Sequence, residues 1–275
     1  MKCLHPIMVR GVSHPCGQCI GCRMNYARDW AIRLHCEAEG KEACFVTLTF
    51  DDEHLPLSIS KRELQLFIKR ARKIAPFRYF ACGEYGEKSG RPHYHLAIIG
   101  QGIFSPLFSE QTYYPRKKGY DVKCSAWTNG KIFVGNLTED SANYVAGYML
   151  KKVKGRLANK AYRDKGLIPP FSLMSRRPGL GQEWCLKNAS WLKERGALLY
   201  KQRPTPLPRY FLHQIFSKDE LVETAYRRQC ERFVDPVYEL ATADYCDADL
   251  RLERIAQAEK NVLARSPKNR ERFSE

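Results

Sequence analysis

The sequence has no long apolar run. A membrane-spanning helix needs about 18 consecutive, mostly uncharged apolar residues, and no stretch of the chain provides them. The first residues, MKCLHPIMVRGVSHPC, contain no sustained apolar segment of the kind found in secretory signals. No internal repeat is detectable either. We therefore expect no membrane association, and 275 residues with 44% hydrophobic content suffice for one or two domains.

Cysteine occurs without the pattern of a disulfide framework. The 11 cysteines are an odd number, and several lie in apolar stretches, among them Cys36, Cys44 and Cys82. Proteins that depend on disulfides usually pair an even number of cysteines in an oxidising compartment. The pattern predicts reduced thiols in the cytoplasm.

Acidic residues are too few to balance the basic ones, and the formal net charge is +16. Residues 1–216 hold 35 Lys/Arg and 17 Asp/Glu, a net of +18, whereas residues 217–275 hold 11 and 13, a net of −2. In the basic part, the stretch YYPRKKGY at 113–120 mixes aromatic and basic side chains. This combination suits phosphate contacts and base stacking. Because no amphipathic Lys/Arg helix with Trp or Leu opposite is present, nucleic acid is a better candidate partner than a membrane.

Periodicity predicts an antiparallel sheet with helices. Residues 23–36 are expected to be helical, and CFVTLTF at 44–50 alternates like a half-buried strand. Ser60-Lys61-Arg62-Glu63 is a capping box at the start of an amphipathic helix. Residues 77–83 and 93–99 are predicted strands, and the Gly-rich turn between them indicates an antiparallel hairpin.

The later part of the chain is less regular. Residues 101–130 are predicted to be a loop-rich insertion, and residues 131–135 a further strand. A helix is expected to begin near Asp140 or Ser141. The stretch QRPTPLP at 202–208 is typical of a linker. The order of elements predicts an α+β sandwich with an antiparallel sheet.

Two of only seven histidines stand together in GRPHYHLAIIG at 90–100. Because side chains alternate along a strand, His93 and His95 share one face and can bind one metal ion. The hairpin should bring Glu84 back beside them, which completes a two-histidine, one-carboxylate set suited to Mn²⁺ or Mg²⁺. Glu87 in the same turn is a rival carboxylate, and the alternative is a strand with two half-exposed histidines.

A second pattern lies in NYVAGYMLKK at 143–152. Tyr144, Tyr148 and Lys152 are spaced i, i+4 and i+8, which places them on one helical face. A tyrosine hydroxyl beside a metal-polarised phosphate is a competent nucleophile. The lysine would lower the pKa of the phenol or stabilise charge on the phosphate oxygens. Alternatively, the two tyrosines pack in the core.

A third pattern is a cysteine-rich segment near the N-terminus. Cys16, Cys19 and Cys22 have the spacing of metal ligands, and a structural zinc site needs four. The candidates for the fourth ligand are Cys3, His5 and His14. No second Cys-x-x-Cys is present to complete a zinc ribbon, and a set of reduced thiols is the alternative.

Together these motifs resemble the HUH endonucleases, the class of rolling-circle replication initiators. FVTLTF at 45–50, RPHYHLAII at 91–99 and YVAGYMLKK at 144–152 follow the order of the family motifs. Two tyrosines four residues apart, followed by lysine, are typical of the initiators of small single-stranded DNA phages. HPCGQCIGCR at 14–23 and SRRPGLG at 175–181 are similar to initiators of gokushoviruses within the Microviridae.

The resemblance spans about residues 14–181 and implies a five-stranded antiparallel sheet flanked by helices, with a C-terminal helical extension. It implies a site-specific DNA endonuclease and strand-joining enzyme with His93, His95 and Glu84 as ligands of Mg²⁺ or Mn²⁺. Tyr144 and Tyr148 would be the nucleophiles that form a 5′-phosphotyrosine link and later close a circle. The implied partners are single-stranded or supercoiled origin DNA with host helicase and polymerase, in the cytoplasm of a bacterial host cell.

The expected organisation has four segments. They are a Cys/His-rich segment (1–43), the endonuclease core (44–154), a basic DNA-contacting extension (155–216) and a charged helical tail (217–275). The residues expected to bind DNA are Arg91, Lys151, Arg176 and Arg177. Arg176 and Arg177 would otherwise form a solvated turn, and the tail a solvated helical face or a partner-binding element. The rival functions are a non-catalytic, zinc-containing nucleic-acid-binding protein and an HUH transposase or relaxase.

Overall fold

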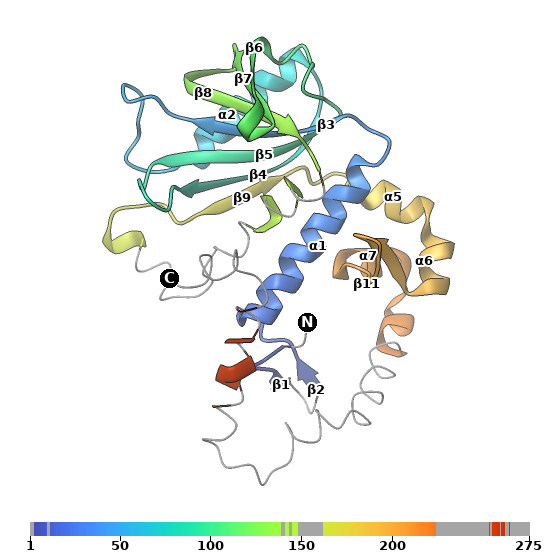
Figure 1. Cartoon of the computed structure of the whole chain (residues 1–275). Helices are drawn as coiled ribbons and strands as arrows, with labels where there is room; N and C mark the ends of the chain where they lie inside the picture. The colour runs from blue at the N-terminus through green and yellow to red at the C-terminus, as the bar shows by residue number, and fades with distance from the viewer. Residues whose placement is uncertain are drawn as a thin grey trace.

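The computed structural model describes residues 3–9, 12–138, 141–142, 145–147 and 162–223, with short runs between 253 and 264. Within these ranges no helix has both the length and the apolar character that a membrane crossing requires. The central element is a sheet with the strand order β6-β7-β8-β3-β5-β4-β9, and each neighbouring pair is antiparallel (Figure 1). Its strands are β3 (Ala43–Thr49), β4 (Arg78–Tyr85), β5 (Pro92–Ile99), β6 (Ser109–Tyr114), β7 (Gly119–Cys124), β8 (Trp127–Asn136) and β9 (Phe171–Met174).

The α+β class and the antiparallel sheet are confirmed, with seven strands where five were expected. The additional strands β6 and β7 form a hairpin joined by η1 (Pro115–Lys117), inside the stretch that was predicted to be a loop-rich insertion. That prediction was wrong because β6 is an edge strand without a buried face. A strand that buries neither face has no apolar alternation in its sequence.

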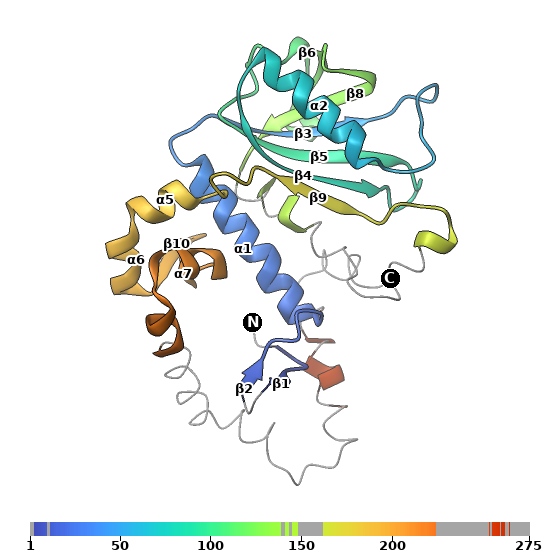
Figure 2. The ribbon, with the colours of Figure 1, turned by 180° about the vertical axis from the view of Figure 1, so that it is seen from behind.

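One face of the sheet is covered by α2 (Lys61–Ile74), which crosses it in Figure 2. The core beneath α2 is built from alternate strand residues, including Val46, Leu48 and Leu96, each 0% exposed. The predicted cap forms, since Ser60 Oγ accepts a hydrogen bond from the Glu63 N–H at 3.3 Å. The reciprocal half of the capping box does not form, because the Glu63 carboxylate accepts hydrogen bonds from Tyr94 and Asn129 instead.

The opposite face is covered by α1 (Ile20–Ala38), α5 (Gln182–Lys187), α6 (Ala189–Arg195) and α7 (Arg209–Ile215). The C-terminal half of α1 packs on the sheet through Trp30, whose ring centroid lies 5.0 Å from that of Phe80. The guanidinium of Arg33 lies between the rings of Trp30 and Tyr210, at 4.1 and 3.9 Å from their centroids. These contacts fix α1 and α7 together against the sheet.

Two small hairpins complete the described fold. β1 (Ile7–Val9) pairs with β2 (Val12–His14), and Figure 1 shows α1 running from the sheet towards this hairpin. β10 (Ala197–Tyr200) pairs with β11 (Arg203–Pro206), so the prediction of a linker at 202–208 was wrong. Prolines are tolerated because both strands of a two-stranded hairpin are edges, and the composition therefore looks like that of a linker.

Candidate metal centre and cysteine cluster

The β4–β5 hairpin brings Glu84, His93 and His95 together. The register pairs Glu84 with His93 and Cys82 with His95, so both histidines and the carboxylate lie on one face. One ligand atom from each residue lies within 4.8 Å of the others. This is the face that α1 covers, because Phe80, Cys82 and the α1 side chains share one core cluster.

Both imidazoles point at a single oxygen. The Nε2 atoms of His93 and His95 lie 2.8 and 3.2 Å from Glu84 Oε1. On the other side of the His93 ring, Nδ1 lies 3.0 Å from the carbonyl oxygen of Arg91. A carbonyl only accepts hydrogen bonds, so Nδ1 of His93 carries the proton, and Nε2 of the neutral ring is the atom available to a metal.

The electrostatics of the cluster favour a cation. Glu84 is 5% exposed and His95 is 6% exposed. Burial alone would raise the pKa of Glu84, but hydrogen bonds from His93 and His95 outweigh it and lower the pKa to about 2. The carboxylate is therefore anionic, and its Oε2 atom has no hydrogen-bond partner among the described residues. A buried anion with such an oxygen fits a divalent ion.

The structure distinguishes between the two candidate carboxylates. Glu84 is in the cluster, whereas Glu87 is exposed in the turn after β4 and belongs to neither group of ligand atoms found among the described residues. The predicted set of two histidines and one carboxylate is thus brought together with Glu84 as its acid. That it binds metal stays a prediction.

Sequence reasoning missed Thr47. Its Oγ1 atom lies 3.0 Å from Nδ1 of His95, the ring nitrogen that faces away from Glu84. Phe45 stacks on the same imidazole, with the ring centroids 5.4 Å apart. The alternation of β3 placed both residues on one face, but only the pairing of β3 with β5 shows that this face contacts His95.

Tyr144, Tyr148, Lys151 and Lys152 lie outside the described residues. Their described neighbours begin a helix. Thr138 accepts a hydrogen bond from the Ser141 N–H at 3.2 Å, so the helix is capped slightly earlier than predicted. Val145 and Ala146 are 0% exposed and belong to the core cluster on the face of Glu84.

The described arginines that were expected to bind DNA have different surroundings. Arg91 contacts Asp52 at 2.6 Å and the Phe50 carbonyl at 3.1 Å, so its guanidinium is held against the loop after β3. Arg176 and Arg177 are exposed in the turn that follows β9. DNA contact by these residues stays a prediction.

The β6–β7 hairpin exposes the mixture of aromatic and basic residues noted in the sequence. Tyr113 and Tyr114 are 53% and 42% exposed, and the rings of Tyr113 and Tyr120 are 5.0 Å apart. Arg116 and Lys118 lie in the exposed turn between the strands. The hairpin therefore presents flat rings beside positive charges, as single-stranded nucleic acid requires.

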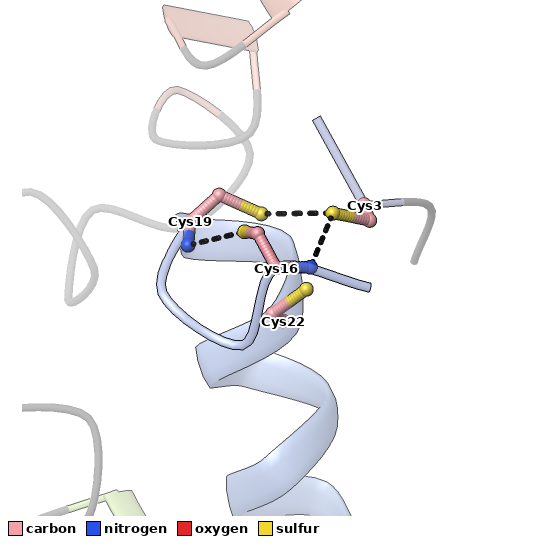
Figure 3. Close-up of side chains that lie close together, drawn as sticks. All are labelled: Cys3, Cys16, Cys19 and Cys22. Atoms are coloured by element: carbon pink, nitrogen blue, oxygen red, sulfur yellow. Dashed lines mark hydrogen bonds between the residues drawn. The ribbon is translucent and has the colours of Figure 1, made fainter. Parts of the chain in front are cut away.

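Four cysteines form a second cluster, at the N-terminus of α1. The sulfur atoms of Cys3, Cys16, Cys19 and Cys22 all lie within 4.8 Å of one another (Figure 3). His5 and His14 are exposed and outside the cluster, so the structure selects Cys3 as the fourth member. None of the nine described cysteines forms a disulfide, which agrees with the odd, scattered pattern of the sequence.

Comparison with known proteins agrees with these motifs. Residues 43–153 match the family described as replication-associated protein ORF2. Replication-associated protein VP4 of Bdellovibrio phage phiMH2K is 35% identical over 215 residues, which are 72% of this chain and 65% of the relative. Replication-associated protein ORF2 of Spiroplasma virus 4 is 32% identical over 222 residues, 72% of this chain and 66% of the relative.

A third relative, replication-associated protein ORF4 of Chlamydia phage 1, is 30% identical over 154 residues, covering 50% of this chain and 38% of its own length. The chain spans slightly less than two thirds of the length of the first two relatives. No solved structure matches. The three relatives are proteins of Microviridae, the group that the sequence motifs resemble. Through its segment 43–153, which contains Glu84, His93 and His95, the chain therefore belongs to the family of phage replication-associated proteins.

Proposed function

We propose that the chain is a replication initiator that nicks and rejoins origin DNA by tyrosine transesterification in the cytoplasm of a bacterial host. The observation that carries the proposal is the convergence of His93 Nε2 and His95 Nε2 on Glu84 Oε1, on the sheet face where Val145 and Ala146 are buried. The relatives' names, which associate them with replication, support the biological setting.

Glu84, His93 and His95 are the residues that would hold Mg²⁺ or Mn²⁺. When bound, such an ion polarises a phosphate oxygen and stabilises the charge that develops on it. The carbonyl of Arg91 and the hydroxyl of Thr47 keep the two imidazoles in place, each from the side remote from Glu84. The site is nearly closed to solvent on its protein side, since Glu84 and His95 are buried, so these groups lose little freedom when DNA binds.

Tyr144 and Tyr148 supply the nucleophiles. The phenolic oxygen of one tyrosine attacks the scissile phosphorus, the tyrosine–phosphate bond forms as the bond to the 3′ oxygen breaks, and the phenolic proton is released. Lys152 stabilises the phenolate and the negative charge on phosphorus oxygens. The products are a 5′-phosphotyrosine and a 3′-hydroxyl that host polymerase extends behind a host helicase. The second tyrosine then attacks the regenerated site, and the released 3′-hydroxyl attacks the first link to close the circle.

DNA is held mainly through its phosphates. Residues 1–216 carry a net charge of +18, and the exposed Arg176, Arg177 and Lys118 add positive charge on different parts of the surface. Tyr113 and Tyr114 offer stacking surfaces for unpaired bases. The partner that fits these features is single-stranded or locally melted origin DNA, with Arg91 and Lys151 as further contacts.

The test is formation of a covalent adduct. The purified chain is incubated with Mn²⁺ and a tiled set of single-stranded oligonucleotides covering the replicon that encodes it, and denaturing gels are examined for a protein–DNA species. We expect an adduct with one subset of oligonucleotides, lost in His93→Ala and His95→Ala and retained in His213→Ala. His213 is exposed on α7, outside the cluster, and serves as the matched control.

Adduct formation by the His93→Ala, His95→Ala double variant would refute the metal centre. Binding of all oligonucleotides without an adduct would instead support the rival function, a non-catalytic zinc-containing nucleic-acid-binding protein, which the cysteine cluster favours. An adduct without preference for any oligonucleotide would refute a role at a defined origin. Strand exchange between two unlinked sites would point to a transposase or relaxase.

A further inference from the structure

We propose that Cys3, Cys16, Cys19 and Cys22 bind a structural Zn²⁺ ion that joins the N-terminal hairpin to the start of α1. Four sulfur ligands at a tetrahedral zinc, each about 2.3 Å from the metal, lie about 3.8 Å from one another. The Sγ atoms of Cys3 and Cys19 are 3.8 Å apart, and all four lie within 4.8 Å (Figure 3). The cluster therefore needs only small side-chain rotations to accept the ion.

The backbone around Cys16 is shaped to support a thiolate. The N–H groups of Gln18 and Cys19 both point at Cys16 Sγ, at 3.4 and 3.3 Å. The tight turn that aims them depends on Gly17, whose φ is +73°. L-residues rarely adopt this conformation, so the glycine is required by the turn. Backbone N–H donors stabilise a thiolate more than a neutral thiol, which would return only a weak bond.

Two further hydrogen bonds connect parts of the chain that are distant in sequence. The Cys16 N–H donates to Cys3 Sγ at 3.3 Å, and the Leu4 N–H donates to Cys19 Sγ at 3.4 Å. The segment that begins at Cys3 is thus linked to the Cys16–Cys19 turn through sulfur in both directions. Sulfur is a poor acceptor unless it is charged, so four such bonds in one cluster indicate thiolates.

The position of the cluster on α1 favours negative charge. Cys19 is the N-cap residue of α1 and Cys22 lies in its first turn, so both face the positive end of the helix dipole. This helix end has no acidic residue in its first turn and no side-chain cap among the described residues. Four thiolates around Zn²⁺ carry a net charge of −2 and supply the missing complement.

The proximity of the thiols also calls for a cation. Burial raises the pKa of Cys19, but hydrogen bonds from Leu4 and Cys22 outweigh it and lower the pKa to about 6. Burial and the neighbouring Cys19 raise the pKa of Cys22. Without a metal, ionisation of one thiol therefore suppresses ionisation of the next. Bound Zn²⁺ removes this conflict because it deprotonates each ligand it coordinates.

The surrounding structure is too small to hold its shape by apolar packing. β1 and β2 are three residues each, and Ile7, Met8 and Val9 are 51%, 66% and 47% exposed. An isolated two-stranded hairpin is marginally stable in water, and small units without a core depend on metals or disulfides. The described cysteines form no disulfide. Zinc therefore supplies the link that keeps the hairpin on α1.

Metal content of the full chain tests the site. We expect one tightly bound zinc per chain by mass spectrometry of the metal, retained after dialysis against a weak chelator. The Cys3→Ser and Cys19→Ser variants should lose this zinc, while Cys124→Ser should keep it, because Cys124 is a buried cysteine in β7 outside the cluster. His14→Ala should also keep it. Loss of zinc in His14→Ala and retention in Cys3→Ser would overturn the ligand set.

A second measurement needs no variant and is unaffected by misfolding. The chain is alkylated with a maleimide before and after zinc is removed with a strong chelator, and the labelled peptides are identified by mass spectrometry. We expect Cys3, Cys16, Cys19 and Cys22 to become reactive together on zinc removal. Equal reactivity of the four before and after, or a chain purified without zinc, would overturn the proposal.

The zinc site stands apart from the nicking activity, and the two failures are distinguishable. The His93→Ala, His95→Ala double variant should lose adduct formation but keep zinc and the protected thiols. Loss of zinc in that double variant would place the ion at the histidines and refute the cysteine site. Retained zinc together with an absent adduct in the wild-type chain would refute only the nicking function.

Discussion

Thr47 Oγ1 and His95 Nδ1 lie 3.0 Å apart across the β3–β5 pair. With Nε2 of His95 directed at Glu84, this contact fixes which face and which tautomer the imidazole presents to a metal. Groups that hold a metal-binding histidine in this way are worth roughly 10–100-fold in metal affinity or activity. The hydroxyl of Thr47 is therefore a positioning group for the proposed centre.

We predict that Thr47→Val raises the Mn²⁺ concentration needed for half-maximal adduct formation by roughly 10-fold or more, with DNA affinity unchanged. Thr49→Val is the matched control. It lies two residues along the same strand, and its hydroxyl donates instead to the carbonyl of Lys131. A Mn²⁺ titration of both variants measures the effect. Equal curves for the two variants would show that the Thr47 hydroxyl does not position His95.

Replacing the acid tests the carboxylate assignment. Glu84→Gln removes the charge that both imidazoles face, so it should raise the Mn²⁺ requirement strongly in calorimetric metal titrations. Glu87→Gln changes an exposed residue outside the cluster and should leave metal affinity as it is. The reverse ranking of the two variants would mean that the turn rearranges and Glu87 is the ligand.

The tyrosine pair makes a distinct kinetic prediction. Because Tyr144 and Tyr148 are four residues apart, each single Phe variant should still form an adduct, at unequal rates, and the double variant none. Neither single variant should release closed circles, since closure needs a second nucleophile while the first is occupied. Mass spectrometry of the nucleotide-linked peptide identifies the attacking residue. Circle closure by either single variant would contradict the two-tyrosine mechanism.

Binding of single-stranded DNA should weaken steeply with salt, because released counterions drive it. Each phosphate contact contributes a slope of about −0.7 in log K against log salt. The double variant Arg176→Ala, Arg177→Ala should therefore reduce the slope by about 1.4. Deleting residues 217–275, which carry a net charge of −2, should change it by less than one contact. Fluorescence anisotropy at several salt concentrations measures both, and a larger effect of the deletion would contradict the basic-surface argument.

The sequence was sufficient to predict the metal cluster because its geometry is local. Glu84 and His93 are joined by a single turn, so strand alternation and one hairpin determine their shared face. Thr47 could not be found in the same way, because β3 lies 44 residues or more before His93 and its pairing depends on the order of the whole sheet. Likewise, three cysteines followed from spacing, whereas Cys3 was one of three candidates until the fold brought it to them.

The predictions that failed share a physical cause. β6 is polar and largely exposed, and the strand that contains Pro204 and Pro206 belongs to a two-stranded hairpin. Sequence patterns report burial, so strands that bury little are read as loops or linkers. The buried strands, such as β5, were placed almost to the residue.

The described sheet ends in β6 on one side and β9 on the other. β9 has only four residues, and β6 is interrupted by a register shift between Ser109 and Thr112, where Glu110 has a φ of +49°. A strand from another copy of the chain would meet a short or kinked row of backbone groups at either border. The borders of the sheet thus disfavour strand-to-strand aggregation, which suits a protein that would be concentrated on one DNA molecule.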